Sequence, residues 1–160
     1  SRLYRTSWEV MEQLGYEQYE VSNYARQGKR CVHNVNTWRM DQWIGLGPSG
    51  ASQFRGRRYS NVPDLERWLE ARGGPDSGRV DESELTPELL LEDCLIFGLR
   101  MNDGVDLEAL ESRFGRGVTE KQGPILSQLN ADGKLIREGN RIRLTDEGRM
   151  VADAIGVELM

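Results

Sequence analysis

The sequence is poor in the residues that metal sites and membrane spans need. Its 160 residues include two cysteines, Cys31 and Cys94, and one histidine, His33. Two distant cysteines provide neither a disulfide framework nor a paired zinc site, and a single imidazole excludes chemistry that needs two. No apolar run approaches the 18 or so residues of a membrane span, and the amphipathic N-terminus lacks a signal peptide's apolar core. We therefore expect a reduced, cytoplasmic protein.

The charges are unevenly placed along the chain. Hydrophobic residues make up 38% and charged residues 29%, which is typical of a globular protein and excludes a highly charged disordered tail. Residues 76–160 carry an excess of acids, with a net charge of −8. Residues 24–60, in contrast, carry Asp41 as their only acid against seven cations: Arg26, Lys29, Arg30, Arg39, Arg55, Arg57 and Arg58.

This contrast, together with a glycine- and proline-containing seam at residues 73–78, predicts two units. All four tryptophans lie in the first 68 residues, so the aromatic character differs between the units as well. We place the units at residues 1–75 and 76–160.

The first unit begins with apolar residues at helical spacing over 3–14, ended by Gly15, and then an aromatic-rich strand over 16–21. A helix, glycine and strand with little before them are typical of the last unit of an α/β repeat. We therefore expect the chain to begin within a larger fold. Residues 22–62 show no strong helical period, with a short strand expected near 43–46, and a helix is expected from Pro63 in its first turn to Gly73.

The second unit has clear start and stop signals. Thr86 caps a helix that extends to about residue 99, and Asp106 caps a short helix that ends at Gly115. A third helix over 119–131 precedes a hairpin of residues 135–138 and 141–144, and Thr145 caps one last helix. Three helices followed by a hairpin predict a winged-helix-like domain.

Winged helices often bind nucleic acid, so this function is one alternative. The third helix and the hairpin offer Lys121, Lys134, Arg137, Arg141 and Arg143. Phosphate binding needs a basic face, whereas this unit carries a net charge of −8. We therefore expect no DNA partner.

The basic stretch 24–60 is the better candidate for a binding site, because its cations alternate with aromatic residues. Cations beside flat rings suit a flat anion, such as a porphyrin with carboxylates or a stacked base, although solvated charges over core aromatics would give the same pattern. Within it, Cys31 and His33 would face the same side of an extended segment, where an imidazole or thiolate could bind iron. A structural, hydrogen-bonded His33 beside Asn34 and Asn36 is the alternative. Cys94 lies on an apolar helix face, as a buried and unreactive thiol would.

Three segments resemble one known family: residues 15–26 (GYEQYEVSNYAR), 31–38 (CVHNVNTW) and 45–52 (GLGPSGAS). They are similar to the C-terminal part of oxygen-independent coproporphyrinogen-III-oxidase-like radical SAM proteins, closest to the haem-chaperone branch. The resemblance covers nearly the whole chain. It implies an α+β fold: the remnant of a radical SAM α/β barrel, then a small β-containing region, then a winged-helix-like C-terminal domain.

Members of that family carry an N-terminal barrel in which a Cys-x3-Cys-x2-Cys motif holds a [4Fe–4S] cluster that binds S-adenosylmethionine. This chain has no such motif, so the resemblance implies a C-terminal fragment without radical chemistry of its own. The implied partners are haem or porphyrin, the parent's own barrel and haem-receiving proteins. An exposed barrel-strand edge would also favour self-association.

The resemblance also implies site residues. The family motif His-Asn-x-x-Tyr-Trp falls on His33, Asn34, Thr37 and Trp38, with Thr37 in place of the tyrosine, and Ala51 stands where relatives have a histidine. His33 is our first choice as the haem iron ligand and Cys31 the second, with Trp38 as a stacking face. The cations expected at the propionates are Arg26, Lys29, Arg30 and Arg39. The alternative from the same resemblance is a parent enzyme that acts on coproporphyrinogen.

Overall fold

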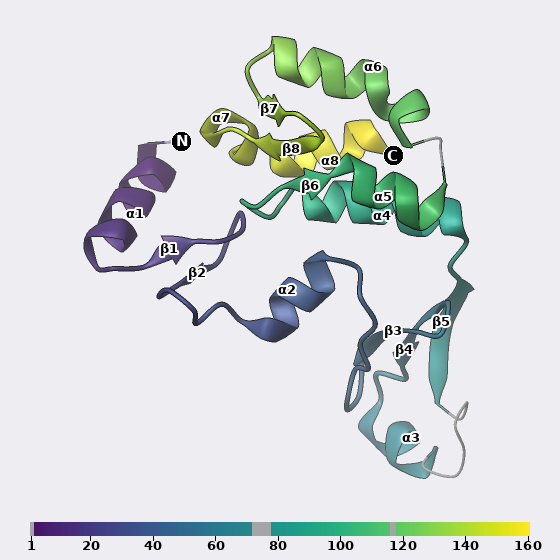
Figure 1. Cartoon of the computed structure of the whole chain (residues 1–160). Helices are drawn as coiled ribbons and strands as arrows, with labels where there is room; N and C mark the ends of the chain where they lie inside the picture. Colours follow the sequence, from purple (N-terminus) through teal and green to yellow (C-terminus); the bar gives the residue numbers. More distant parts are fainter. Residues whose placement is uncertain (1, 72–77, 116–117) are drawn as a thin grey trace.

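A computed structural model describes residues 2–71, 78–115 and 118–160 of the chain. Figure 1 shows three parts: an N-terminal arm, a helical body that contains the C-terminus, and a three-stranded sheet that extends away from this body. Helix α2 lies between the arm and the sheet. The fold is therefore a mixture of helix and sheet, as expected.

The N-terminal arm contains the predicted helix, α1 (Arg2–Gln13), which ends before Gly15 at a φ of +77°. The predicted strand is shorter than expected, because the chain turns back after β1 (Glu17–Gln18) to form an antiparallel hairpin with β2 (Tyr24–Ala25). The Glu20 carboxylate stabilises this turn, since its Oε1 accepts hydrogen bonds from the Ser22 N–H at 2.8 Å and the Asn23 side chain at 2.6 Å. The barrel-remnant interpretation of this arm stays a prediction.

Helix α2 (Val32–Trp38) was missed by the sequence analysis, which expected no helix between residues 22 and 62. Its residues are mostly weak helix formers, so local propensity does not indicate it. Tertiary packing stabilises it instead, because Val35 and Trp38 pack on a buried cluster of Tyr19, Ala25 and Met101.

The extended sheet is antiparallel, in the order β3 (Ala51–Phe54), β4 (Arg57–Asn61), β5 (Arg79–Glu84). The strand expected near residues 43–46 is reduced to an isolated bridge between Trp43 and Gln53. Strand β5 follows the predicted unit boundary and pairs with β4, which precedes it. The seam itself falls almost entirely on residues 72–77, outside the described residues.

Helix α3 (Leu65–Glu70) follows β4 in the sequence, and Asp64 caps it by accepting a hydrogen bond from the Arg67 N–H at 2.9 Å. Pro63 therefore precedes the cap and does not lie in the first turn, contrary to the prediction. The expected end at Gly73 lies outside the described residues.

The helical body matches the predicted elements closely. Its predicted elements are α4 (Pro87–Gly98), α5 (Leu107–Phe114), α6 (Val118–Ala131), β7 (Leu135–Glu138) and β8 (Arg141–Leu144). A short strand, β6 (Val105–Asp106), was not predicted and gives a sheet with the order β6-β8-β7. The single last helix expected after Thr145 is two helices, α7 (Asp146–Arg149) and α8 (Ala152–Leu159), separated at Met150 and Val151. The winged-helix-like description stays a prediction.

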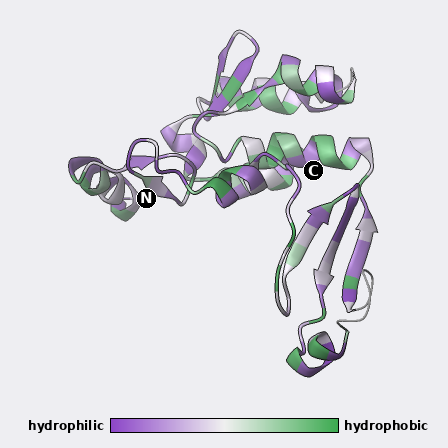
Figure 2. Cartoon of the chain, turned by 60° about the horizontal axis from the view of Figure 1, so that its bottom comes forward, coloured by the Kyte–Doolittle hydropathy of each residue, from purple (hydrophilic) through white to green (hydrophobic). Residues whose placement is uncertain are grey.

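The main hydrophobic core lies in the helical body. Figure 2 shows hydrophobic residues on its helices, while strands β3–β5 are largely hydrophilic. Val21 and Met40, from the first half of the chain, are buried in the same core. The two halves of the sequence therefore share one core. Among the described residues, no helix combines the length and apolar character that crossing a lipid bilayer requires.

Candidate functional site

The candidate site lies where the segment around α2 meets the C-terminal end of α4. The backbones of residues 19–21 and 100–102 are joined there: the Val21 N–H donates to the Arg100 carbonyl at 3.0 Å, and the Asn102 N–H donates to the Tyr19 carbonyl at 3.0 Å. This pairing joins the segment just before the basic stretch to the acidic second half.

Trp38 packs against this joint. Its ring centroid lies 5.8 Å from that of Phe97, and the Arg100 guanidinium lies 4.9 Å from the Trp38 ring centroid. The Trp38 side chain is only partly exposed. Trp38 thus packs within the protein, and this arrangement does not support its expected role as a stacking face for a ligand.

Ion pairs join the basic stretch to the acidic half. Arg30 Nη1 lies 2.7 Å from Asp103 Oδ2, and Arg39 Nη2 lies 3.8 Å from the same oxygen. Arg58 Nη2 lies 2.8 Å from Asp93 Oδ2 on α4. The opposite net charges of the two halves are therefore complementary, and some of the cations expected to face a ligand also contact the protein.

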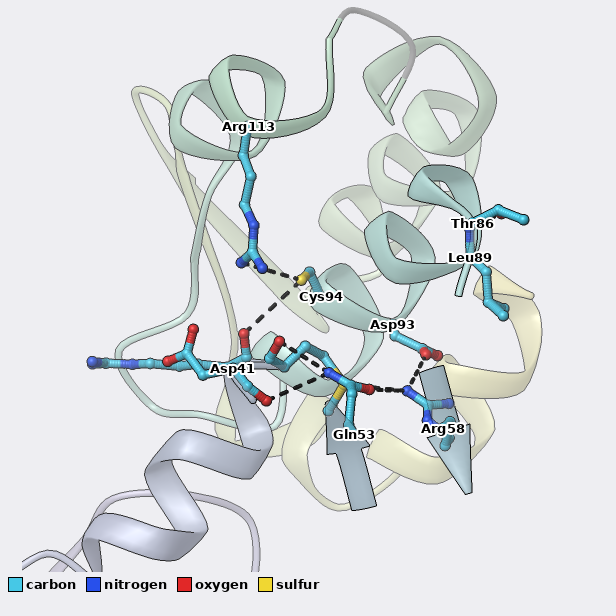
Figure 3. A network of polar contacts seen from close by, with 10 residues as sticks. Asp41, Gln53, Arg58, Thr86, Leu89, Asp93, Cys94 and Arg113 are labelled. Carbon is cyan, nitrogen blue, oxygen red and sulfur yellow. Dashed lines mark hydrogen bonds and ion pairs between the residues drawn. The ribbon is translucent and has the colours of Figure 1, made fainter. Parts of the chain in front are cut away.

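A polar network fixes the chain segment that follows α2 (Figure 3). Gln53, on β3, is only 3% exposed and donates through Nε2 to the Met40 carbonyl at 3.1 Å. Its Oε1 accepts a hydrogen bond from Arg58, which in turn pairs with Asp93. This network connects the sheet, α4 and residues 39–41, so Arg39 extends from a constrained backbone.

The extended segment that would place Cys31 and His33 on the same side is not present, because residues 32–38 are helical. Cys31 is the residue that precedes the first turn of α2, and His33 lies in that turn; both are exposed. Cys31 itself keeps an extended backbone, with a φ of −66° and a ψ of 112°, so the helix starts between the two candidate ligands.

A cavity of about 330 Å³ lies beside α2 and collects part of the predicted site. Its lining residues are Arg30, Val32, Val35, Asn36, Arg39 and Asp41. The residues of α2 and its C-terminal end that line it are spaced by three or four along one helix face. Val32 is 81% exposed, so this face offers uncovered apolar surface in a cavity that two arginines also line. His33, the next residue of α2, is exposed but does not line the cavity.

The remaining predicted residues lie around this cavity. Arg26 lies over the Tyr16 ring at 5.2 Å from its centroid, which directs it towards the N-terminal arm. Lys29 is exposed, whereas Asn34 is partly covered, and neither lines the cavity. The structure thus brings Arg30 and Arg39 together at one cavity, with exposed His33 next to the lining residue Val32 in the sequence.

Sequence reasoning missed Val32, Asp41 and Asp103. The apolar and polar residues at 32, 35, 36 and 39 were the one available signal, since they repeat at helical spacing. Asp103 gave no signal, because it lies far along the chain from the arginines that it contacts.

Cys94 is a buried thiol, as predicted, at 5% exposure. Its Sγ lies 4.0 Å from the Arg39 carbonyl and 3.9 Å from Arg113 Nη1. Burial raises the pKa of Cys94 to about 11, so its thiol is protonated at neutral pH.

The chain's own residues do not fit a [4Fe–4S] cluster. Such a cluster needs at least three thiolates, and the chain has two cysteines, one buried and protonated and the other exposed. Within the described ranges, no group of three His, Cys, Asp or Glu side chains is placed to hold a metal ion.

Comparison with known proteins gives consistent relatives. Residues 85–151 match the family model "HemN C-terminal domain". The haem chaperone HemW of Lactococcus lactis is 28% identical over 91% of this chain and 38% of its own length. The haem chaperone HemW of Mycobacterium tuberculosis H37Rv is 31% identical over 88% of this chain and 34% of its own. The mitochondrial radical S-adenosyl methionine domain-containing protein 1 of Danio rerio is 30% identical over 96% and 37%.

The fold leads to the same group. The structure matches that of coproporphyrinogen III oxidase (HemN) from Escherichia coli, a radical SAM enzyme, with a TM-score of 0.75 and 16% identity, over 97% of this chain and 39% of that one. At this identity the likeness concerns the fold alone. The chain spans well under half the length of the relatives described. These findings show that the chain belongs to the HemN/HemW-like radical SAM protein family, with residues 85–151 as its HemN C-terminal domain.

Proposed function

We propose that this chain supplies a haem- or porphyrin-binding surface for haem delivery by a haem chaperone of the HemW type. The relatives named haem chaperone support the class of protein. The observation that carries the proposal is the face of α2, where Arg30, exposed Val32 and Arg39 line one cavity and exposed His33 follows Val32 in the chain.

The chemistry of this face suits a tetrapyrrole. A haem is a flat apolar ring with two carboxylate arms, so it needs apolar contact, cations and, for its iron, a neutral ligand. Val32 offers the apolar contact. Arg39, which lies 3.8 Å from Asp103, offers the charge, and Arg30, already paired with Asp103 at 2.7 Å, offers its remaining N–H donors. His33 offers an imidazole, which is a common iron ligand.

The other residues take secondary roles in this proposal. Cys31 is the alternative iron ligand, since it is exposed just before the first turn of α2. Arg26 and Lys29 would add charge at the periphery, and Asn34 would position α2. Trp38 is omitted, because it packs between Phe97 and Arg100.

Other components belong to the whole protein. The [4Fe–4S] cluster and S-adenosylmethionine of radical SAM proteins would be held by residues outside this chain, because its own residues do not fit the cluster. We propose a radical SAM barrel and haem-receiving proteins as the partners of the α2 face.

A porphyrin-synthesising enzyme is the second candidate, and the fold match to coproporphyrinogen III oxidase favours it. In that case, Arg30 and Arg39 would hold substrate carboxylates and no iron ligand would be needed. Decarboxylation of coproporphyrinogen III by the full-length protein would support this candidate.

The side chains predicted as DNA contacts argue against nucleic-acid binding. Lys121 on α6 pairs with Glu92, and Arg143 on β8 lies 3.2 Å from Glu138. Arg141 lies 3.5 Å from Asp106. These pairs offset the charge that phosphate binding would need.

Haem titration of the protein tests the iron ligand. We expect His33→Ala to change the Soret spectrum and to weaken haem binding about tenfold or more, since an iron–imidazole bond is lost. Arg67→Gln, a charge change on the exposed surface of α3, is the matched control and should leave both unchanged. An unaltered spectrum and affinity in His33→Ala, with both altered in Cys31→Ala, would transfer the role to Cys31. Unaltered binding in both variants would contradict axial ligation by this surface.

A further inference from the structure

A second cavity, of about 300 Å³, shares the lining residue Arg39 with the first. It is enclosed by the end of α4, the turn into β6, helix α5 and strand β8. Three arginines line it, Arg39, Arg113 and Arg141, together with two carboxylates, Asp103 and Asp106. Three separate parts of the chain therefore bring guanidinium groups to one small space.

The rest of the lining carries no charge. It includes glycine and apolar side chains such as Met101 and Leu110, as well as the Cys94 thiol. Because this thiol is protonated, it does not offset the arginines. The cavity therefore combines apolar walls with three guanidinium groups and two carboxylates.

Both carboxylates are already used within the protein. Asp103 receives its shortest ion pair, 2.7 Å, from Arg30, which does not line this cavity, and it lies 3.8 Å from Arg39. Asp106 caps α5, since its Oδ1 accepts the Ala109 N–H at 3.1 Å, and its Oδ2 lies 3.5 Å from Arg141. Arg39 is thus paired only loosely.

Arg113 has no carboxylate partner among the described residues. Its Nη1 lies 3.9 Å from Cys94 Sγ, and its guanidinium lies 4.8 Å from the centroid of the neighbouring Phe114 ring. Figure 3 shows the Arg113 side chain reaching from α5 towards Cys94. A guanidinium that faces a neutral thiol retains most of its capacity to bind an anion.

We propose that this cavity is a carboxylate pocket in which Arg113, assisted by Arg39, binds a carboxylate carried on a short apolar arm. For the identity of its ligand, the inference rests on the proposed function: the arm is a propionate of a tetrapyrrole whose ring lies on the α2 face. Arg39 lines both cavities, which makes them neighbours. A space of about 300 Å³ is at the small end of ligand pockets, and suits an arm and a ring edge.

The test uses metal-free protoporphyrin IX, because binding without iron does not depend on His33 or Cys31. Two further probes distinguish a porphyrin carboxylate from a free acid. The dimethyl ester of protoporphyrin has the ring but no carboxylate, and sodium propionate has a carboxylate but no ring. Binding is measured by fluorescence for the porphyrins and by calorimetry for propionate. Arg113→Gln is compared with Arg137→Gln, a control that removes an exposed arginine of β7 outside this cavity.

We expect Arg113→Gln to weaken protoporphyrin binding about tenfold or more, because a charge-assisted pair is lost. Arg113→Lys should be intermediate and Arg137→Gln unchanged. The dimethyl ester should bind weakly and equally to all variants. Coincident thermal unfolding curves would show that the variants fold alike.

Other outcomes show separately whether the carboxylate pocket or the proposed haem function is wrong. If protoporphyrin binds equally to the original protein and Arg113→Gln, the pocket is overturned while the haem proposal stands. If propionate binds in an Arg113-dependent way and neither haem nor protoporphyrin binds, the pocket stands with a free acid as ligand and the haem proposal is overturned. If none of these ligands binds, both are overturned.

Discussion

The two cysteines show how strongly local surroundings determine a side chain's chemistry. Cys31 is exposed before the first turn of α2, whereas Cys94 is buried at 5% exposure among core residues of α4. Burial raises the pKa of Cys94 to about 11, chiefly because a thiolate would lose its hydration there. Since the thiolate is the reactive form, the two sulfur atoms should react at very different rates.

This difference predicts selective alkylation. At pH 8 only about one Cys94 in a thousand is a thiolate, so iodoacetamide should label Cys31 quickly and Cys94 very slowly, as followed by mass spectrometry of the peptides. Labelling of Cys94 should rise as the pH approaches 11. Equal labelling rates at pH 8 would contradict the buried position.

The same pKa shift predicts that stability depends on pH. Because the folded state holds the Cys94 proton more tightly than the unfolded state, its contribution to stability should be full below about pH 9 and fall as the pH rises towards 11.

At the scale of elements, the helices with local signals were predictable and α2 was not. Thr86 and Asp106 each accept a hydrogen bond from the N–H three residues on, at 3.2 and 3.1 Å, which is the contact that their residue types predict. The signal for such a cap lies within four residues. In contrast, α2 depends on packing of Val35 and Trp38 against Met101, more than 60 residues away in the sequence.

The turn between α4 and β6 depends on Gly104. Its φ is +68°, and a Cβ at this position would lie 2.1 Å from the Ile142 carbonyl oxygen of β8. We expect Gly104→Ala to lower the free energy of unfolding by about 3 kcal/mol or more, because the backbone of β8 would have to shift. Gly139→Ala is the control: φ is +63° there too, but the added Cβ meets nothing within 4 Å, so about 1 kcal/mol is expected. Urea unfolding measures both, and similar losses would contradict the close approach of β8.

At the scale of the whole molecule, the two halves of the sequence form one packed structure. Val21 and Met40 are buried in the core of the helical body, and Arg30 and Arg58 pair with acids of that body. Strand β5 pairs with β4 across the boundary that composition predicts. The contrast in charge between the basic first half and the acidic second half thus marks two oppositely charged surfaces that contact each other.

This shared core predicts cooperative unfolding. Far-UV circular dichroism, tryptophan fluorescence and hydrogen exchange of the Val21 and Leu95 amides should report one transition. Trp38→Ala should shift all of these probes together and cost about 2–4 kcal/mol, because it removes the ring packed between Phe97 and Arg100. Early loss of protection at Val21, with Leu95 still protected, would show that the first half unfolds separately.

The sequence by itself determined the elements whose causes are local: the capped helices, the hairpin at residues 135–144 and the burial of Cys94. It also indicated the family, because residues 15–26, 31–38 and 45–52 resemble segments of its members in the same order. Only the tertiary structure decided that His33 lies in a helix that Cys31 precedes, that Trp38 packs against Phe97 and Arg100, and that Arg39 lines two cavities, the second together with Arg113. These features arise from contacts between residues far apart in the chain, such as Arg30 with Asp103. Such contacts produce no periodic pattern in the sequence from which they could be predicted.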